Sequence, residues 1–136
     1  MSIMAGNEKL TSAEAYLNRG NAYYSKSDID GAIEDYTEAI RLNPKYADAY
    51  FNRGNVYKSE NNFEKAIADY SEAIRLDPKF ADAYCNRGTI YGMKGDFDKA
   101  SADFKAILQL SPNNDNAAAI TNAKKNLELI RQKRGW

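Results

Sequence analysis

Histidine is absent from this chain of 136 residues, and cysteine occurs once, as Cys85. Histidine is the commonest general base and a frequent metal ligand, and a lone thiol has no histidine to activate it. The chain also contains no glycine-rich phosphate-binding loop. We therefore expect a protein that is not an enzyme and has no catalytic residue, cofactor or metal site. A single cysteine also excludes an intramolecular disulfide, which is consistent with a reducing compartment.

Long apolar runs are missing as well. No stretch approaches the roughly 20 apolar residues that span a bilayer, and residues 1–6 do not resemble the beginning of a signal peptide. Charge of one sign is not in excess, because Lys and Arg total 19 and Asp and Glu total 19. No net field therefore attracts nucleic acid or an anionic membrane. These features predict a cytoplasmic protein that binds neither.

What the chain does have is a repeat of 34 residues. The motif Tyr-x-Asn-Arg-Gly-x-x-Tyr begins at residues 16, 50 and 84, and each copy is followed by Ala-x-x-Asp-aromatic and then by a proline. A fixed period of this length is typical of stacked units that bury their core between neighbours. The sequence therefore predicts a repeat array rather than one closed globular core.

Within each unit, apolar residues recur at steps of three and four, which indicates amphipathic helices. Asp28, Asn62 and Asp96 are suited to cap a following helix, and Thr11-x-x-Glu14 has the pattern of a capping box. The three prolines are expected to end one helix and to stand at the first position of the next, with Asn, Asp or Ser as its cap. The predicted helices lie near residues 12–26, 29–42, 46–60, 63–76, 80–94, 97–110 and 114–133.

Counted from Ala13, Ala47 and Ala81, the units match the tetratricopeptide repeat pattern at positions 4, 8, 11, 20, 24 and 32. The chain therefore resembles the tetratricopeptide repeat (TPR) family from residue 13 to residue 114. This resemblance implies an all-α fold, a right-handed α–α superhelix (TPR solenoid) of about seven antiparallel helices. The expected segments are an extension at 1–11, repeats at 12–46, 47–80 and 81–114, and a capping helix at 115–136.

Two contacts between the helices of a repeat are predicted. The motif glycines lie within a helix, where glycine costs about 1 kcal/mol relative to alanine; this is tolerable if an aromatic ring of the second helix lies over them. Arg19, which stands where the family usually has leucine, should lie level with Asp35 or Glu38. The equivalent pairs are Arg53–Asp69 and Arg87–Asp103. We interpret these as structural surface pairs worth about 0–1 kcal/mol, because carboxylates 34 residues apart do not converge on a catalytic site.

By resemblance, the first helix of each repeat lines a concave groove. The expected groove residues are Asn18, Asn52, Asn86, Asn21, Asn55, Leu17, Phe51, Asp48, Asp82, Tyr24 and Lys58. Asparagine stands at position 6 of every repeat, and its amide can donate to and accept from a peptide backbone. A similar asparagine ladder lines the TPR superhelix of the O-linked N-acetylglucosamine transferases. The alternative is that these amides only complete local hydrogen bonds.

A second binding mode of the family is a carboxylate clamp that holds the acidic tails of heat-shock chaperones. The chain keeps Asn21 and Asn52 of that clamp but has Leu17, Asp82 and Asn86 in place of its basic residues. A chaperone tail is therefore not expected to bind in this way. The acidic residues Glu14, Asp48 and Asp82, at position 2 of the three repeats, indicate that the partner segment is neutral or basic. The alternative is that they only form a solvated helix face.

The first hypothesis is thus a non-catalytic adaptor that binds a peptide segment of another protein in the groove. The alternative is a self-assembling scaffold, a homo-oligomer with contacts at Ile29, Ile33, Ile40 and the bare face of the first helix. A third hypothesis is that the chain is the binding domain of a larger multi-domain protein whose catalytic part lies elsewhere.

Overall fold

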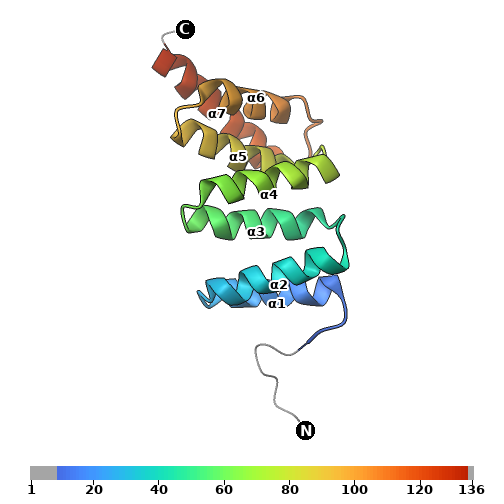
Figure 1. The fold of residues 1–136 in the computed structure, drawn as a ribbon. Coiled ribbons are helices and arrows are strands. Elements are labelled where there is room, and N and C mark those ends of the chain that lie inside the picture. Colours follow the sequence, from blue (N-terminus) through green and yellow to red (C-terminus); the bar gives the residue numbers. More distant parts are fainter. Residues whose placement is uncertain (1–8, 135–136) are drawn as a thin grey trace. The chain divides into compact units, whose positions relative to one another are not determined.

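In a computed structural model of the protein, the structure describes residues 9–134, which form seven α-helices and no strand (Figure 1). Residues 1–8 of the extension expected at 1–11 therefore lie outside the described residues. The same holds for residues 135 and 136 of the capping helix expected at 115–136. The helices are α1 (Ala13–Ser25), α2 (Ile29–Leu42), α3 (Ala47–Ser59), α4 (Phe63–Leu76), α5 (Ala81–Met93), α6 (Phe97–Leu108) and α7 (Ala117–Arg134). The all-α prediction is confirmed, and each helix ends within about three residues of its expected bounds.

The chain divides into two compact units, Met1–Asp69 and Tyr70–Trp136, which we call unit 1 and unit 2. Helix α4 contributes its first half to unit 1 and its second half to unit 2. Each unit has its own hydrophobic core, and each is described by itself below.

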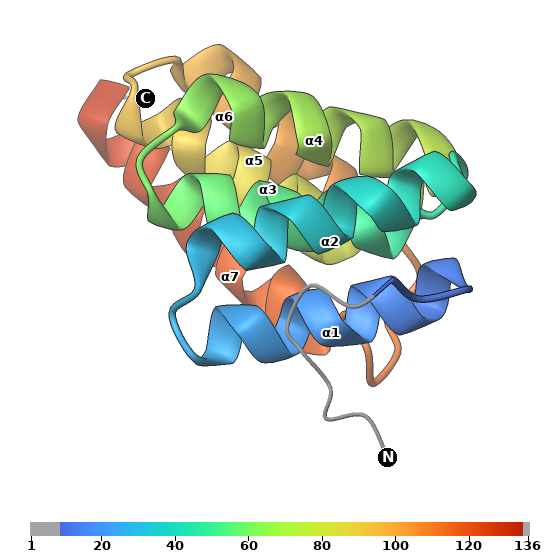
Figure 2. The same cartoon turned by 60° about the horizontal axis from the view of Figure 1, so that its bottom comes forward.

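In unit 1, α1 and α2 form an antiparallel hairpin, and α3 packs on α2 (Figure 2). The buried core consists of Tyr16, Leu17, Ala32, Tyr36, Ala39, Ala49 and Val56. A Cβ atom added to Gly20 would lie 2.8 Å from Cε1 of Tyr36. Such a contact is too short for real atoms, so glycine is what allows the ring to lie over α1, as the sequence predicts.

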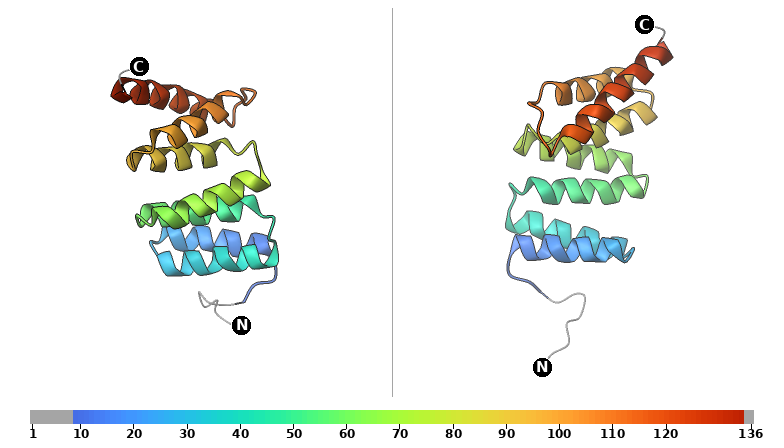
Figure 3. Two further views of the ribbon diagram at one scale, coloured as in Figure 1. Left: turned by 45° about the horizontal axis from the view of Figure 1, so that its top comes forward. Right: turned by 180° about the vertical axis from the view of Figure 1, so that it is seen from behind.

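In unit 2, α5 and α6 form a second hairpin, and α7 runs obliquely across it (Figure 3). The buried core consists of Ala81, Ala100, Phe104, Ile107, Ala119, Ala123 and Ile130. A Cβ atom added to Gly88 would lie 3.1 Å from Cζ of Phe104, so a ring again covers the motif glycine. Helix α7 supplies three of the buried residues and therefore covers the apolar side of this hairpin.

The turn that follows the first helix of each repeat has the same geometry. Ser27, Asn61 and Gly95 have φ values of 62°, 58° and 81°. The next backbone N–H, that of Asp28 in the first turn, donates to the carbonyl oxygen of Tyr23 at 2.8 Å, and the other turns repeat this bond. This is the Schellman ending of a helix. The Asp28 side chain then accepts from the N–H of the third residue after it, and the equivalent residues do the same, which confirms the predicted N-caps.

The predicted capping box at the start of the first helix is wrong. Ser12 is the N-cap residue of α1, and its side chain accepts from the N–H of Ala15 at 3.0 Å. The pattern Thr11-x-x-Glu14 is one residue out of register with this bond. Because Ser12 supplies a short side-chain oxygen at the residue where the helix begins, it satisfies the free N–H in place of Thr11.

The prediction for the prolines is also wrong in one respect. Pro44 and Pro78 lie in turns, and α3 and α5 begin three residues later without a side-chain cap. The side chain of Asn43 accepts from the N–H of Lys45 at 3.1 Å, two residues further along the chain. This local turn uses the oxygen that was expected to cap the next helix.

Candidate functional site

An ion pair joins two helices in each of the three repeats. The pairs are Arg19–Asp35, Arg53–Asp69 and Arg87–Asp103, each with two hydrogen bonds of 2.7–2.9 Å. The predicted pairing is confirmed, but the prediction that these are surface pairs is wrong. The aspartate side chains are 5–7% exposed and the arginine side chains 18–19%. These are largely buried bidentate pairs, in which removal of one partner leaves a buried charge unpaired.

The arginine of each pair also lies between two tyrosine rings. The guanidinium carbon of Arg19 is 5.5 Å from the ring centre of Tyr16 and 5.8 Å from that of Tyr23. The hydrogen bond to Asp35 raises the pKa of Arg19, against an opposing effect of burial. The later repeats stack their arginines in the same way. The tyrosines and arginines of the repeated motif therefore serve packing, so most residues of this motif do not belong to the candidate site.

A contact that the sequence analysis missed links the arginines to the preceding second helix. Nη1 of Arg53 donates to Oγ1 of Thr37 at 3.1 Å, and Nη1 of Arg87 donates to Oγ of Ser71 at 2.9 Å. Both acceptors stand at position 25 of their repeats. The recurrence of a hydroxyl side chain at this position is the feature of the sequence from which the contact could have been predicted. These bonds tie one repeat to the next within each unit.

In unit 1, two of the expected groove asparagines are joined to each other. Nδ2 of Asn52 donates to Oδ1 of Asn21 at 3.1 Å, and the Tyr36 hydroxyl donates to the same oxygen. Burial, with a smaller effect of Tyr24, raises the pKa of Tyr36 to about 12. Part of the hydrogen-bonding capacity of this row is therefore used inside unit 1. Asn18 is exposed, and its side chain makes no hydrogen bond among residues 9–134.

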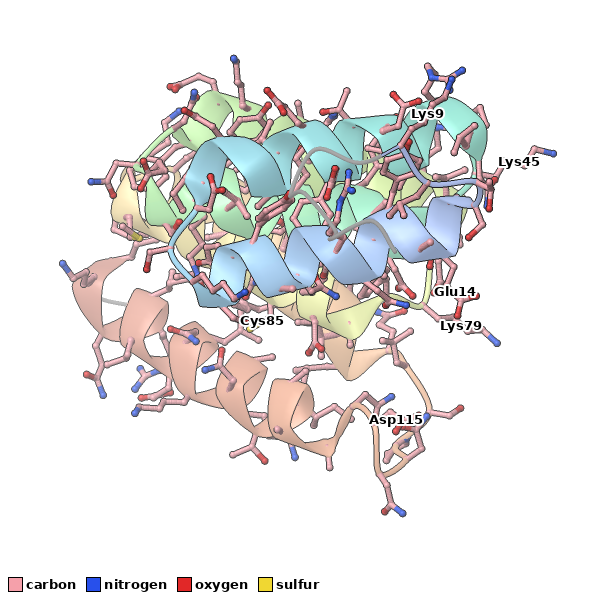
Figure 4. The ribbon with its side chains drawn as sticks, turned by 90° about the horizontal axis from the view of Figure 1, so that it is seen from below. Lys9, Glu14, Lys45, Lys79, Cys85 and Asp115 are labelled. Atoms are coloured by element: carbon pink, nitrogen blue, oxygen red, sulfur yellow. The ribbon has the colours of Figure 1, made fainter. Side chains whose placement is uncertain are left out.

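The expected apolar row at position 5 is not uniform. Leu17 is 8% exposed and belongs to the core of unit 1, so little of it faces a ligand. Phe51 is half-buried. Cys85 is half-buried on α5, and its Sγ lies 3.1 Å from Oδ1 of Asn122 on α7 (Figure 4). The three positions thus offer a ligand very different surfaces.

The remaining expected residues also differ between repeats. Asn55 and Asn86 are half-buried. Position 12 holds Tyr24, which is 38% exposed, then the half-buried Lys58, and then Gly92, which has no side chain. The shape of this surface therefore changes along the chain, although the framework repeats.

Three carboxylates at position 2, Glu14, Asp48 and Asp82, are exposed. Figure 4 shows the Glu14 side chain pointing away from the helices. The pKa of Tyr46 is raised, first by burial and then by the charges of Glu14 and Asp48. Two of the exposed carboxylates at position 2 thus belong to unit 1 and act on the same ring.

A hollow of about 630 Å³ lies on unit 1 beside α1 and α2. Tyr16, Arg19 and Tyr23 line it together with five carboxylates of residues 28–38. The isoleucines expected to mediate self-assembly, Ile29, Ile33 and Ile40, are half-buried and pack against the unit 1 core. A second copy of the chain that docks on this hollow would thus contact aromatic and acidic side chains more than aliphatic ones.

No group of three or more His, Cys, Asp or Glu side chains in the described part of the chain is arranged to hold a metal ion. Among the same residues, no helix combines the length and the apolar character needed to cross a membrane. The candidate surfaces are the exposed faces of the first helices and the hollows beside them.

Comparison with known families gives the class of the protein. A model described as "TPR repeat" matches residues 20–60 and 54–95, and one described as "Tetratricopeptide repeat" matches residues 81–114. The chain belongs to the tetratricopeptide repeat family. A search of curated proteins finds no match.

Solved structures agree with this assignment. MamA is 36% identical with a TM-score of 0.70, over 87% of this chain and 62% of the MamA chain, so this chain spans about three-fifths of that protein. The first TPR of Spaghetti (RPAP3), bound to the HSP90 peptide SRMEEVD, is 26% identical with a TM-score of 0.79, over 92% and 97%. The second TPR domain of human RPAP3, in complex with the HSP70 peptide SGPTIEEVD, is 32% identical with a TM-score of 0.71, over 83% and 92%. The TPR fold is confirmed, and the peptide-bound relatives support a protein-interaction module.

Proposed function

We propose that this protein is a non-catalytic adaptor that binds a peptide segment of a partner protein along the first helices of its repeats. The observation behind this proposal is the recurrence of asparagine at position 6, at residues 18, 52 and 86. Arginine, glycine and tyrosine recur in the same motif, but their contacts explain them as packing. Asn18 is exposed and makes no such contact among the described residues, so packing does not explain its recurrence.

The partner segment is neutral or basic in this proposal. The carboxylates of Glu14, Asp48 and Asp82 are exposed, and they repel an acidic peptide. Although RPAP3 domains bind chaperone tails, this chain has Leu17 buried and Asp82 where the clamp needs cations. We expect the peptide SRMEEVD, labelled with a fluorophore, to show no saturable anisotropy change with this protein. Saturable binding by the wild-type protein would contradict the assignment, and Asp82→Lys, which supplies one cation, is the variant expected to gain affinity.

Binding along the asparagine row is tested with peptides selected from a random displayed library on the wild-type protein. The triple variant Asn18→Ala, Asn52→Ala, Asn86→Ala is expected to weaken the selected peptides at least about tenfold, since each lost amide contact is worth about 0.5–1.5 kcal/mol. The control is Asn114→Ala, an exposed amide in the loop before α7. Unchanged affinity of the folded triple variant would refute the row as a binding surface.

Self-assembly is the second candidate, and the hollow of about 630 Å³ on unit 1 is the observation that favours it. Because carboxylates of α2 line this hollow, a second copy docks there only through a cationic surface, and such an assembly should weaken with added salt. Light scattering across protein concentration measures this directly. A constant monomer mass at low salt excludes the candidate.

A further inference from the structure

A slot opens in unit 2 because two glycines follow each other by one turn on α5. Gly88 is covered by the Phe104 ring, but a Cβ atom at Gly92 would meet nothing closer than Cβ of Ala100, at 4.0 Å. At the same position the earlier repeats have Tyr24 and Lys58. The third repeat therefore has open space where the other two have a large side chain.

This space is part of a cavity of about 230 Å³ among α5, α6 and α7, all within unit 2. Phe97 and Phe104 contribute rings from α6, and Leu129 and Ile130 contribute aliphatic groups from α7. Met93 at the rim is 62% exposed and Leu129 is 47% exposed. Large apolar side chains at this exposure, around a cavity, are typical of a surface that another molecule covers.

The volume of the cavity limits what can enter it. An engineered apolar cavity of about 150 Å³ binds benzene, whereas pockets for whole drug-sized ligands begin at about 300 Å³. A cavity of about 230 Å³ lies between these sizes. It therefore accepts one aromatic ring with its attached methylene groups, and the rest of the ligand remains outside.

The charge of the rim limits the ligand further. Among the described residues that line the cavity, Lys133 on α7 is the one ionisable side chain, and no carboxylate is present. Lys133 is exposed. The polar groups beside it are the Thr89 hydroxyl, which donates to the carbonyl oxygen of Cys85, and the amide of Asn126. An anion next to the bound ring is therefore favoured over a cation.

We infer that this cavity is an anchor site for one aromatic side chain of a peptide partner, with a carboxylate of the same peptide beside Lys133. The inference rests on the proposed function, because it names one subsite on the same helix face, where Thr89, Gly92 and Met93 stand. It gives unit 2 a preference for an aromatic residue flanked by Asp, Glu or the chain terminus. The carboxylates of unit 1 act on other parts of the segment.

The test uses three small probes that share one ring: 3-phenylpropanoate, 3-phenylpropanamide and 3-phenylpropylamine. Each is titrated into the full chain, and methyl resonances of Met93, Leu129 and Ile130 are followed by NMR. We expect saturable shifts at these methyls, with affinity falling from the carboxylate to the amide to the amine. Shifts confined to other methyls, or an amine that binds as well as the carboxylate, would overturn the inference.

Variants separate the ring from the charge. Gly92→Leu fills the slot and is expected to abolish the shifts, while Lys105→Leu, at an exposed position of α6 outside the cavity, leaves them unchanged. Lys133→Gln is expected to weaken phenylpropanoate about two- to fivefold and phenylpropanamide not at all, as for a partly exposed ion pair. If Gly92→Leu binds the probes like the wild type while folded, as judged by circular dichroism, the anchor site is refuted.

The same probes distinguish failure of the anchor from failure of the adaptor function. The triple asparagine variant is expected to bind phenylpropanoate normally, because none of the three residues lines the cavity. Loss of selected peptides without loss of the probe then supports both proposals. Normal peptide binding by Gly92→Leu together with probe binding by the wild type would refute the anchor as part of the peptide surface.

Discussion

Unit 1 and unit 2 use the same framework but surround it differently. In both, a ring of the second helix lies over the motif glycine, and an arginine of the first helix donates two hydrogen bonds to an aspartate of the second. The ring is Tyr36 in unit 1, where its hydroxyl donates to Asn21. In unit 2 it is Phe104, and the residue equivalent to Asn21 is Thr89, whose hydroxyl donates within its own helix. The hydroxyl and its acceptor thus change together, because the buried hydroxyl of Tyr36 would be left unsatisfied without Asn21.

Two repeat positions also carry smaller side chains in unit 2. Position 21 is Ile33 in unit 1 and Ser101 in unit 2, which is 5% exposed and whose Oγ has no hydrogen-bond partner in the described structure. Position 12 is Tyr24 in unit 1 and Gly92 in unit 2. The comparison teaches that the repeat framework tolerates loss of side-chain volume, and that a cavity forms in the unit where the volume is lost.

The largest expected effect tests what the two units share. Asp35→Ala in unit 1 and Asp103→Ala in unit 2 should each lower the free energy of unfolding by about 3–5 kcal/mol, because a partly buried arginine loses its partner. Urea denaturation measures both. The control is Glu128→Gln, which removes an exposed pair with Arg131 and should leave stability unchanged. A small loss for Asp103→Ala alone would show that the framework is not equivalent in the two units.

The next largest effect tests the hydroxyl that Tyr36 of unit 1 has and Phe104 of unit 2 lacks, through the dependence of the free energy of unfolding on pH. The folded-state pKa of Tyr36 is raised to about 12 from the ordinary 10, so its stabilising contribution is complete below pH 10 and is lost as pH rises to 12. The loss is up to about 2–3 kcal/mol, at 1.36 kcal/mol for each pKa unit. Tyr36→Phe should remove this part of the alkaline loss, measured by urea denaturation at several pH values. Tyr24→Phe, which removes only the smaller contribution of that ring to the raised pKa of Tyr36, should retain most of this loss.

Glycine substitutions compare how closely the helices approach. Gly20→Ala should cost about 1–3 kcal/mol because its Cβ would lie 2.8 Å from the Tyr36 ring. Gly88→Ala, at 3.1 Å from Phe104, should cost less. Gly92→Ala meets ordinary contact only and should stabilise the helix by up to about 1 kcal/mol. Thermal unfolding gives the order, and a destabilising Gly92→Ala would contradict the open slot.

The smallest effect concerns two buried or half-buried serines. Ser101→Ala should raise the free energy of unfolding by about 1 kcal/mol, because it removes an unsatisfied hydroxyl and favours the helix. Ser71→Ala should lower it by a similar amount, since Ser71 accepts a hydrogen bond from Arg87. Chemical denaturation of both variants decides the matter. Equal signs for the two substitutions would mean that the Ser101 hydroxyl is not an unsatisfied group in the folded protein.

Much of the fold could be predicted because it depends on local spacing. The helices, the N-caps Asp28 and Asp96 and the pairing of Arg19 with Asp35 follow from helical periodicity and from the antiparallel order of neighbouring helices. The capping box at Thr11 was wrong by one residue, since adjacent Thr and Ser compete for the same N–H. The degree of burial of the arginine pairs was not predictable, because it depends on the tyrosines packed on both sides.

The candidate site was predicted less completely for the same reason. Asn21 and Asn52 are 31 residues apart, and only the packing of α3 beside the first hairpin brings their amides together. Leu17 has the same repeat position as Phe51, yet the neighbouring helices bury it. Nothing in the spacing of these residues distinguishes a core leucine from a groove residue.

The sequence by itself determined the family, the helix order and the internal ion pairs, because a 34-residue period constrains neighbouring residues in every copy. The tertiary structure decided which of the expected groove residues are already hydrogen-bonded, which are buried, and that Gly92 leaves a cavity rather than a filled surface. Those outcomes depend on how side chains from different helices share space, and volume across an interface is not encoded in the periodicity of any single helix.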